Sequence, residues 1–418
     1  MYLKGRSVPW RGSQRRSNPW RMILWLALIL GTLWVYSLFD QGTIQTPFEP
    51  TPLPTRNPLS WAEEARAQFA AGEFDLAILA YRRALEIDTQ NVDYWVGRAR
   101  VELFAERDAE ALKSAQDAVL LAPESAKARA ILAWALREND RPEEARAAAV
   151  QAIALDGNYA PAHAYYSLIL NDALNTEQGF REAQLALQLD PTLLEAHIAL
   201  GYSNEVVGNY EGAIMRYKDA LALNPNIIET YRKIALNYRA LKDFEQAILY
   251  FGKANSVDPN NVIPYLDLSR TFIQIDQLGT AEQYLNSALE LEPWNPNIHG
   301  RLGVLYFKRK NYESAKPALL LAIEGGEYEV SDTERVTVEP MPLDARSLEY
   351  YYTLGNLMAF YRECGPNEAP YYLSRALSFA PDDATVVGSY EESMAICRDF
   401  LAGAAGPSGE TPAPTAQP

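Results

Sequence analysis

Apolar residues recur at spacings of three and four along most of the chain, and the pattern repeats every 34 residues from about 57 to 325. These spacings predict amphipathic helices, and each period has room for two short ones. One position of the period accepts only alanine, at Ala84, Ala118, Ala152, Ala186, Ala220, Ala254, Ala288 and Ala322. Seven residues earlier the period accepts only small residues, at Ala77, Ala111, Ala145, Gly179, Ala213, Ala247, Ala281 and Ala315. A repeat of this length predicts stacked helical hairpins that bury their apolar faces against their neighbours.

The fifth repeat shows how residues are used within one period. Its first helix carries Leu200 and Gly201, its second carries Tyr217 between two small residues, and Pro225 closes it. Small residues let two helices cross closely, an aromatic ring fills the space beside the crossing, and proline ends a helix. This pattern resembles the tetratricopeptide repeat family over residues 58–402. The resemblance implies an all-α fold, a right-handed α-solenoid of about nine 34-residue helix–turn–helix repeats that binds protein partners and performs no chemistry itself.

The repeats are interrupted once and then capped. Residues 324–347 leave the phase, and their alternating apolar residues predict a short hairpin or an extended loop, with a disordered excursion as the alternative. Insertions into solenoids lie on one face and often contact partners. A ninth repeat follows, and residues 384–402 predict a single amphipathic helix that caps the array. Residues 403–418 are rich in Gly, Pro, Ala and Thr, which predicts disorder.

The amino-terminal segment has a different pattern. Residues 22–39 contain no charged residue, and this length predicts one transmembrane helix. The basic residues all precede it, which predicts a cytoplasmic tail at 1–21 and a single-pass cell-membrane protein with an extracytoplasmic solenoid. A cleaved signal peptide is the alternative, but the apolar run is long and no small-x-small site follows it. Residues 40–57 are rich in proline and predict a semi-extended linker.

Charge is distributed unevenly along the chain. The net charge is −16, but residues 1–39 carry +6, so the remainder carries −22. Such an acidic solenoid argues against nucleic acid as a partner, because phosphate neutralisation needs clustered basic residues.

The repeat phase also predicts which first-helix residues line the inner groove. In the amino-terminal half they include the aromatic residues Trp134, Tyr165 and Tyr202, with Arg100 and Phe104 beside them. In the sixth to eighth repeats they include five basic residues, at Arg232, Arg239, Arg270, Arg301 and Lys308. A concave basic surface favours an acidic protein or peptide as partner. The alternative is that these are solvated charges in an unoccupied groove, and the segment 324–347 is a second candidate surface.

Few residues suggest chemistry. His163, His197 and His299 occupy one helix position in different repeats and cannot converge on a metal. No phosphate-binding loop or nucleophile elbow is present in the sequence, so we predict no enzyme activity, cofactor, metal or small-molecule substrate. Cys364 and Cys397 fall near the ends of two helices that stack side by side in this family, which favours a disulfide over two free thiols.

Together these patterns predict a membrane-anchored interaction scaffold. Its extracytoplasmic solenoid would bind a protein or peptide during assembly of an envelope complex. The alternative is an accessory subunit that selects substrate for an envelope enzyme, such as a glycosyltransferase or a peptidase.

Overall fold

The computed structural model describes residues 18–40, 56–331 and 333–404. The chain divides into two units, Met1–Asn57 and Pro58–Pro418, each described here by itself. The predicted tail at 1–21, the linker at 40–57 and the carboxyl-terminal tail at 403–418 lie largely outside the described residues.

The first unit contains helix α1 (Pro19–Asp40). Over the residues that the structure describes, no helix is both long and apolar enough to cross a bilayer. This finding contradicts the prediction of a transmembrane helix at 22–39.

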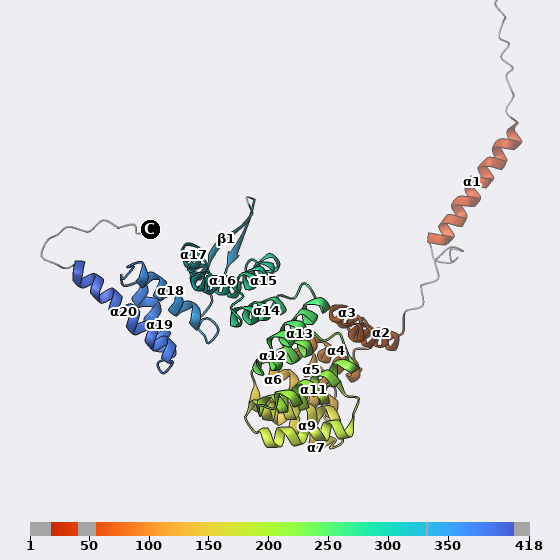
Figure 1. Ribbon diagram of the computed structural model, residues 1–418. Coiled ribbons are helices and arrows are strands. Elements are labelled where there is room, and N and C mark those ends of the chain that lie inside the picture. The colour runs from red at the N-terminus through yellow and green to blue at the C-terminus, as the bar shows by residue number, and fades with distance from the viewer. Residues whose placement is uncertain (1–17, 41–55, 332, 405–418) are drawn as a thin grey trace, which may run out of the picture. The chain divides into compact units, whose positions relative to one another are not determined.

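In the described part of the second unit, consecutive helices pair into hairpins, and each hairpin is one repeat (Figure 1). The solenoid part of the predicted fold fits this arrangement. The pairs are α2 (Pro58–Ala71) with α3 (Phe74–Ile87), α4 (Val92–Phe104) with α5 (Asp108–Leu121), α6 (Ala126–Glu138) with α7 (Pro142–Leu155), α8 (Ala160–Asp172) with α9 (Thr176–Leu189), α10 (Leu194–Val206) with α11 (Tyr210–Leu223), α12 (Ile228–Ala240) with α13 (Phe244–Val257), α14 (Val262–Gln274) with α15 (Leu278–Leu291), α16 (Pro296–Lys308) with α17 (Tyr312–Glu324), and α18 (Leu348–Phe360) with α19 (Ala369–Phe379). Helix α20 (Ala384–Ala404) follows and packs on α18 and α19.

The small residues of the period lie where two helices of a hairpin cross. Ala213 and Ala220 of α11 are fully buried, and Tyr217 between them is 1% exposed. A Cβ atom added to Gly201 of α10 would lie 2.6 Å from the Tyr217 ring. Only glycine therefore allows the ring to lie against the backbone of α10, which explains the pairing of Gly201 with Tyr217.

Each hairpin turn uses one residue in the left-handed backbone region. This position follows the first helix of each repeat and is occupied by Gly72, Glu106, Asp140, Leu174, Gly208, Lys242, Asp276, Lys310 and Arg362. Glycine adopts this conformation without strain, whereas other residues adopt it at a cost of about 1 kcal/mol or more. The packing of the two helices therefore determines the turn even where the sequence does not favour it.

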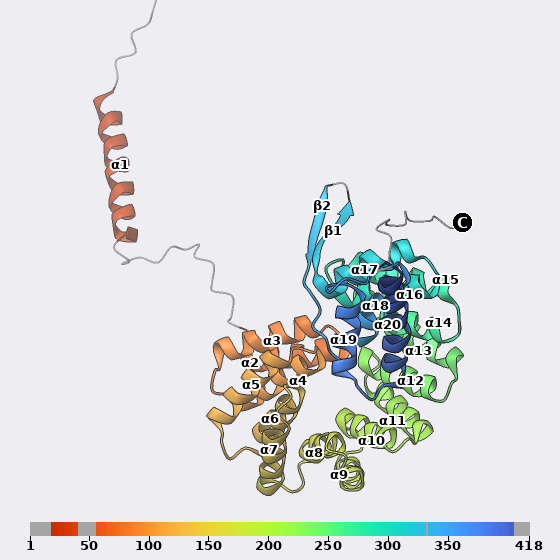
Figure 2. The same ribbon diagram turned by 90° about the vertical axis from the view of Figure 1, so that its left-hand side faces the viewer.

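The insertion at 324–347 contains an antiparallel hairpin of β1 (Gly326–Ser331) and β2 (Glu334–Val338). Its base is held to the array, because Val338 is buried and the amide of Met341 donates to the carbonyl of Ala322 at 2.9 Å. Tyr328 of β1 also contacts the ring of His299, with 4.6 Å between ring centroids. Figures 1 and 2 both show the far end of the hairpin standing clear of the helices.

The first two repeats also contact the fifth repeat and the turn that follows it. Leu194 of α10 and Ile227, which precedes α12, share a buried cluster with Phe69 of α2. The side chain of Asn224 donates to the carbonyl of Phe69 at 3.3 Å, across the same junction. The array thus turns back on itself within its first half. The packing within a single repeat does not by itself require these long-range contacts.

Candidate functional site

The inner face of the amino-terminal half is filled by the protein's own aromatic side chains. Phe104 contacts Trp134 with 5.2 Å between ring centroids, and Trp134 stacks on Tyr165 at 4.8 Å. Trp134 is 8% exposed and Tyr165 is 3% exposed. Tyr165 is therefore packed inside the array and Trp134 keeps only a small exposed edge, and their role in partner binding stays a prediction.

Arg100 completes this filling. Its guanidinium lies 4.6 Å from the centroid of the Phe69 ring and forms a bidentate ion pair with Glu195 of α10. Burial works against the charge on Arg100, but the Glu195 carboxylate outweighs it and raises the pKa of Arg100. The hydroxyl of Tyr165 also donates to Glu195, at 3.4 Å. The ion pair is therefore part of the packing between the second and fifth repeats.

Tyr202 is half-buried and lines a hollow of about 420 Å³ enclosed by the same turn of the array. Its hydroxyl donates to Asp172 at 2.7 Å, and burial together with that carboxylate raises the pKa of Tyr202 to about 12. Basic and acidic residues alternate around this hollow, among them Arg137, Glu138 and Lys233. Mixed charges that neutralise one another give this hollow no preference for an anion.

Two of the five predicted basic groove residues are neutralised by neighbours. Arg232 of α12 donates to Asp267 of α14 at 2.8 Å and also pairs with Glu229. Lys308 lies 3.5 Å from a carboxylate oxygen of Glu349. These two side chains lie on the predicted surface, but their charges are already balanced.

The other three, Arg239, Arg270 and Arg301, have no carboxylate within 4.0 Å among the described residues. Arg239 lies over the ring of Phe251, and its Nη1 is buried without a hydrogen-bond partner in the described part of the chain. Burial, and after it repulsion by Arg270, lower the pKa of Arg239, although the Asp267 carboxylate acts in the opposite direction. Arg239 is packed against α13 and is not among the residues that line the hollow at Arg270 and Arg301.

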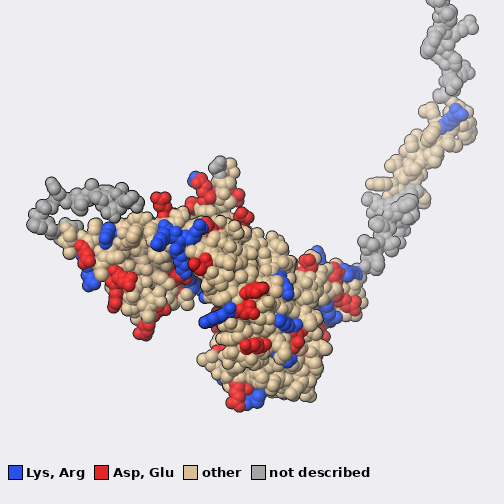
Figure 3. All heavy atoms as spheres, viewed as in Figure 1, with Lys and Arg blue, Asp and Glu red and all other residues tan. Residues whose placement is uncertain are grey.

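Arg270 and Arg301 line a hollow of about 380 Å³, named here the basic hollow. Its other lining residues are Ser269, Ile273, Gln274, Val304, Lys308, Ala345, Arg346, Glu349 and Tyr350. Ala345 and Arg346 belong to the segment 324–347, so the groove and the insertion contribute to a single surface rather than competing as candidates. Figure 3 shows basic side chains gathered over α16–α18 on one face of the array.

Arg301 is positioned in the basic hollow by neutral groups. Its Nε and Nη1 donate to Asn297 Oδ1 at 3.3 Å and to the carbonyl of Leu266 at 3.4 Å. The hydroxyl of Tyr350 donates to the same Asn297 Oδ1 at 2.6 Å. The Tyr350 ring packs so closely on Gly300 that a Cβ atom added to Gly300 would lie only 2.3 Å from it. The guanidinium is thus oriented without being neutralised.

Sequence reasoning missed Arg346 and Tyr350 as residues of this site. Arg346 lies in the insertion and Tyr350 directly follows it, where the 34-residue phase is interrupted, so the register could not assign them to the inner face. Their basic or aromatic character gave no separate signal.

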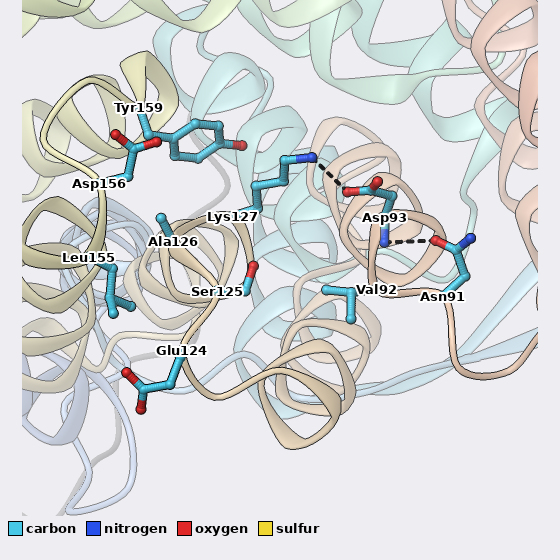
Figure 4. A pocket seen from close by; sticks show the side chains of 10 residues that line it. All are labelled: Asn91, Val92, Asp93, Glu124, Ser125, Ala126, Lys127, Leu155, Asp156 and Tyr159. Atoms are coloured by element: carbon cyan, nitrogen blue, oxygen red, sulfur yellow. Dashed lines mark hydrogen bonds and ion pairs between the residues drawn. The ribbon is translucent and has the colours of Figure 1, made fainter.

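A third hollow, of about 410 Å³, lies where α4, α6 and α8 begin (Figure 4). Lys127 Nζ lies 2.9 Å from Asp93 Oδ1, and the amide of Asp93 donates to Asn91 Oδ1 at 3.1 Å. Lys127 stands one repeat after Asp93, so these contacts link successive helix starts. We therefore interpret this hollow as part of the repeat packing.

The histidines also have structural partners. The Nε2 atoms of His163, His197 and His299 contact the carbonyls of Gly157, Pro191 and Pro293, at 2.8–3.0 Å. Within the described residues no group of three or more His, Cys, Asp or Glu side chains is placed to hold a metal ion.

Cys364 and Cys397 are joined by a disulfide, with 5.4 Å between their Cα atoms. Cys364 follows α18, and Cys397 belongs to α20. The bond therefore ties the last helix to the ninth repeat.

Comparison with known proteins supports the repeat assignment. Sequence models described as tetratricopeptide repeat match residues 228–261 and 276–324. No curated protein matches the sequence.

Among solved structures, the crystal structure of the APC/C hetero-tetramer Cut9-Hcn1 is similar, with TM-score 0.56 and 15% identity over 82% of this chain. This chain spans 57% of that chain, and at this identity the likeness shows the fold alone. Pseudomonas aeruginosa pilF has TM-score 0.41 and 20% identity, covering 47% of this chain and 90% of its own. MamA has TM-score 0.34 and 23% identity, covering 38% of this chain and 92% of its own. The chain therefore contains tetratricopeptide repeats in an all-α helical solenoid, the fold of a protein–protein interaction scaffold.

Proposed function

We propose that the protein is an interaction scaffold that binds an acidic peptide segment of a partner protein in the basic hollow. The observation that carries this proposal is that Arg270 and Arg301 both line the hollow, and neither has a carboxylate within 4.0 Å among the described residues. Like charges held close together in a partly buried hollow cost free energy, and a bound carboxylate relieves that cost. The scaffold itself performs no chemistry in this proposal.

The proposed place of action is an oxidising compartment outside the cytoplasm. The Cys364–Cys397 disulfide supports this placement, because such bonds persist in secreted and envelope proteins and are rare in the cytosol.

A peptide-binding measurement tests the proposed function. Fluorescence anisotropy would compare a labelled Glu-rich peptide with its Gln analogue, on the wild-type protein and on an Arg270→Glu/Arg301→Glu variant. The wild type should prefer the Glu peptide and the variant should lose that preference. An Arg181→Glu/Arg335→Glu variant is the charge-matched control, because these two side chains are 60% and 67% exposed and lie outside the hollow. Equal loss in both variants, or no loss in either, would contradict the proposal.

A further inference from the structure

The basic side chains that line the basic hollow are of two kinds. Lys308 and Arg346 already lie beside carboxylates of the described chain, those of Glu349 and Asp344. The others are the two unpaired arginines of α14 and α16 named above. The negative charge of a ligand therefore has two specific places to bind, one on each of these helices.

Apolar side chains line the hollow next to both unpaired arginines. Ile273 follows Arg270 by three residues on α14, and Val304 follows Arg301 by three residues on α16. Three residues make nearly one helix turn, so each aliphatic side chain lies on the same face as its arginine, about 4.5 Å further along the axis. Val304 is 5% exposed, whereas Ile273 is half-buried. Ile273 therefore keeps apolar surface that a ligand can cover.

The insertion adds further apolar atoms to the lining. Ala345 and the ring of Tyr350 both line the hollow. The segment around Ala345 is held in place, because the hydroxyl of Ser347 donates to the carbonyl of Pro342 at 2.7 Å. The hollow of about 380 Å³ has room for an apolar side chain beside a carboxylate.

We propose that the basic hollow selects an acidic residue of the partner peptide together with a bulky aliphatic residue two positions away. Alternate side chains of an extended peptide point the same way, about 7 Å apart. The carboxylate then pairs with Arg270 or Arg301 while the aliphatic side chain covers Ile273. This inference rests on the proposed function and narrows its ligand, because charge alone no longer defines the partner.

Four labelled peptides with the same flanking residues test the inference by fluorescence anisotropy. The first contains Leu-Gly-Glu-Gly-Leu, and the second contains the same residues as Gly-Leu-Glu-Leu-Gly, which turns the leucines away from the glutamate. The third replaces both leucines of the first by alanine, and the fourth replaces its glutamate by glutamine. The first peptide should bind roughly fivefold more tightly than the second or the third, the effect of covering part of one leucine side chain. The fourth should bind more weakly than the first.

Salt separates the two contributions to binding. Raising the salt from about 50 mM to about 500 mM should weaken all three glutamate peptides, because it screens their attraction to the arginines. The ratio between the first and second peptides should persist, because burial of apolar surface does not depend on charge.

One pair of variants locates the apolar contact. Ile273→Ala should reduce the advantage of the first peptide over the third to less than about twofold, because little apolar surface is left to cover. Ile263→Ala is the matched control and should leave that advantage unchanged. Ile263 is also half-buried on α14 and packs against the same buried cluster, but it does not line the hollow. Circular dichroism would verify that both variants are folded.

The outcomes separate the two proposals. If the first and fourth peptides bind equally, the proposed function fails. If glutamate is preferred but the first and second peptides bind equally, the function stands and the acidic–aliphatic inference is overturned. Equal effects of Ile273→Ala and Ile263→Ala would overturn it as well, because the leucine would then be bound elsewhere.

Discussion

The side-chain amide of Asn226 donates a hydrogen bond to the carbonyl oxygen of Ala70, 2.8 Å away although 156 residues separate the two. The bond joins the turn before α12 to the end of α2. Gly72 lies at the same junction with φ of +83°, and a Cβ added to it would be 2.7 Å from the Cβ of Asn226. The first half of the solenoid is therefore closed by a contact between the Asn226 side chain and the backbone of the first repeat, which leaves no room for a side chain at Gly72.

Replacing Gly72 by alanine should open this junction. Alanine at positive φ costs about 1 kcal/mol, and overpacking against Asn226 adds roughly 1–3 kcal/mol. Gly208→Ala is the matched control, because Gly208 has φ of +79° at the equivalent turn of the fifth repeat but nothing within 4 Å of an added Cβ. Urea unfolding should show that Gly72→Ala lowers the free energy of unfolding more than Gly208→Ala does. Equal losses would mean that the junction does not stabilise the protein.

The ion pair between Arg100 and Glu195 predicts a second long-range coupling. The Glu195 side chain is only 3% exposed, so Arg100→Leu leaves a buried carboxylate and should cost about 3 kcal/mol of the free energy of unfolding. The double variant Arg100→Leu/Glu195→Leu should be more stable than the single one, because it leaves no uncompensated charge. Arg83→Leu, in an exposed pair whose side chains are both 52% exposed, should change stability by less than about 1 kcal/mol. An additive double-mutant cycle would refute the coupling.

The sequence predicted the repeats because each helix boundary depends on residues within one period. Packing within one repeat selects the small residues Ala213, Ala220 and Gly201, and the same packing recurs in every repeat. The contact of Asn226 with Ala70 is different, since it depends on small rotations summed over several repeats. The same accumulated rotation buries Trp134, although an aromatic residue is equally expected in a groove or in a core.

In the candidate site, too, position was more predictable than charge state. The register placed Arg232, Arg270 and Arg301 on the inner face, but it could not show that Asp267 neutralises Arg232 and leaves the other two unpaired. Ion pairing depends on which side chains face each other across neighbouring helices, and a shift of one helix turn changes the partner.

His163 predicts a pH dependence of stability. Its Nδ1 lies 2.7 Å from Glu182 Oε2 and its Nε2 lies 3.0 Å from the carbonyl of Gly157, so both contacts are satisfied only when both nitrogens carry protons. The hydrogen bond to Glu182 outweighs burial and raises the pKa of His163. Its contribution is therefore fully present below the unfolded pKa of about 6.5 and is lost as pH rises through the folded value.

The destabilisation by His163→Gln should accordingly be larger at about pH 5.5 than at about pH 8.5, on either side of the unfolded pKa. His299 is the internal control, because burial lowers its pKa and gives the opposite sign. Histidine titration by NMR should place the pKa of His163 above, and that of His299 below, the ordinary value. A pKa of His163 at or below that value would contradict the prediction.

The disulfide between Cys364 and Cys397 predicts that the last helix depends on oxidation while the rest of the solenoid does not. It closes a loop of 33 residues, for which chain entropy gives about 3–4 kcal/mol of stabilisation. Without it, α20 keeps short polar contacts such as Ser393 to Asn356 at 2.9 Å and the packing of Val386. A Cys364→Ser/Cys397→Ser variant should therefore lose amide-exchange protection in α20 and, to a smaller extent, in α18 and α19. Because repeats interact chiefly with their neighbours, protection in α2–α11 should be unchanged.

Reducing the wild type should reproduce this pattern, and the same reductant should have no effect on the variant. Loss of protection throughout the array would show instead that the cap stabilises the whole solenoid cooperatively.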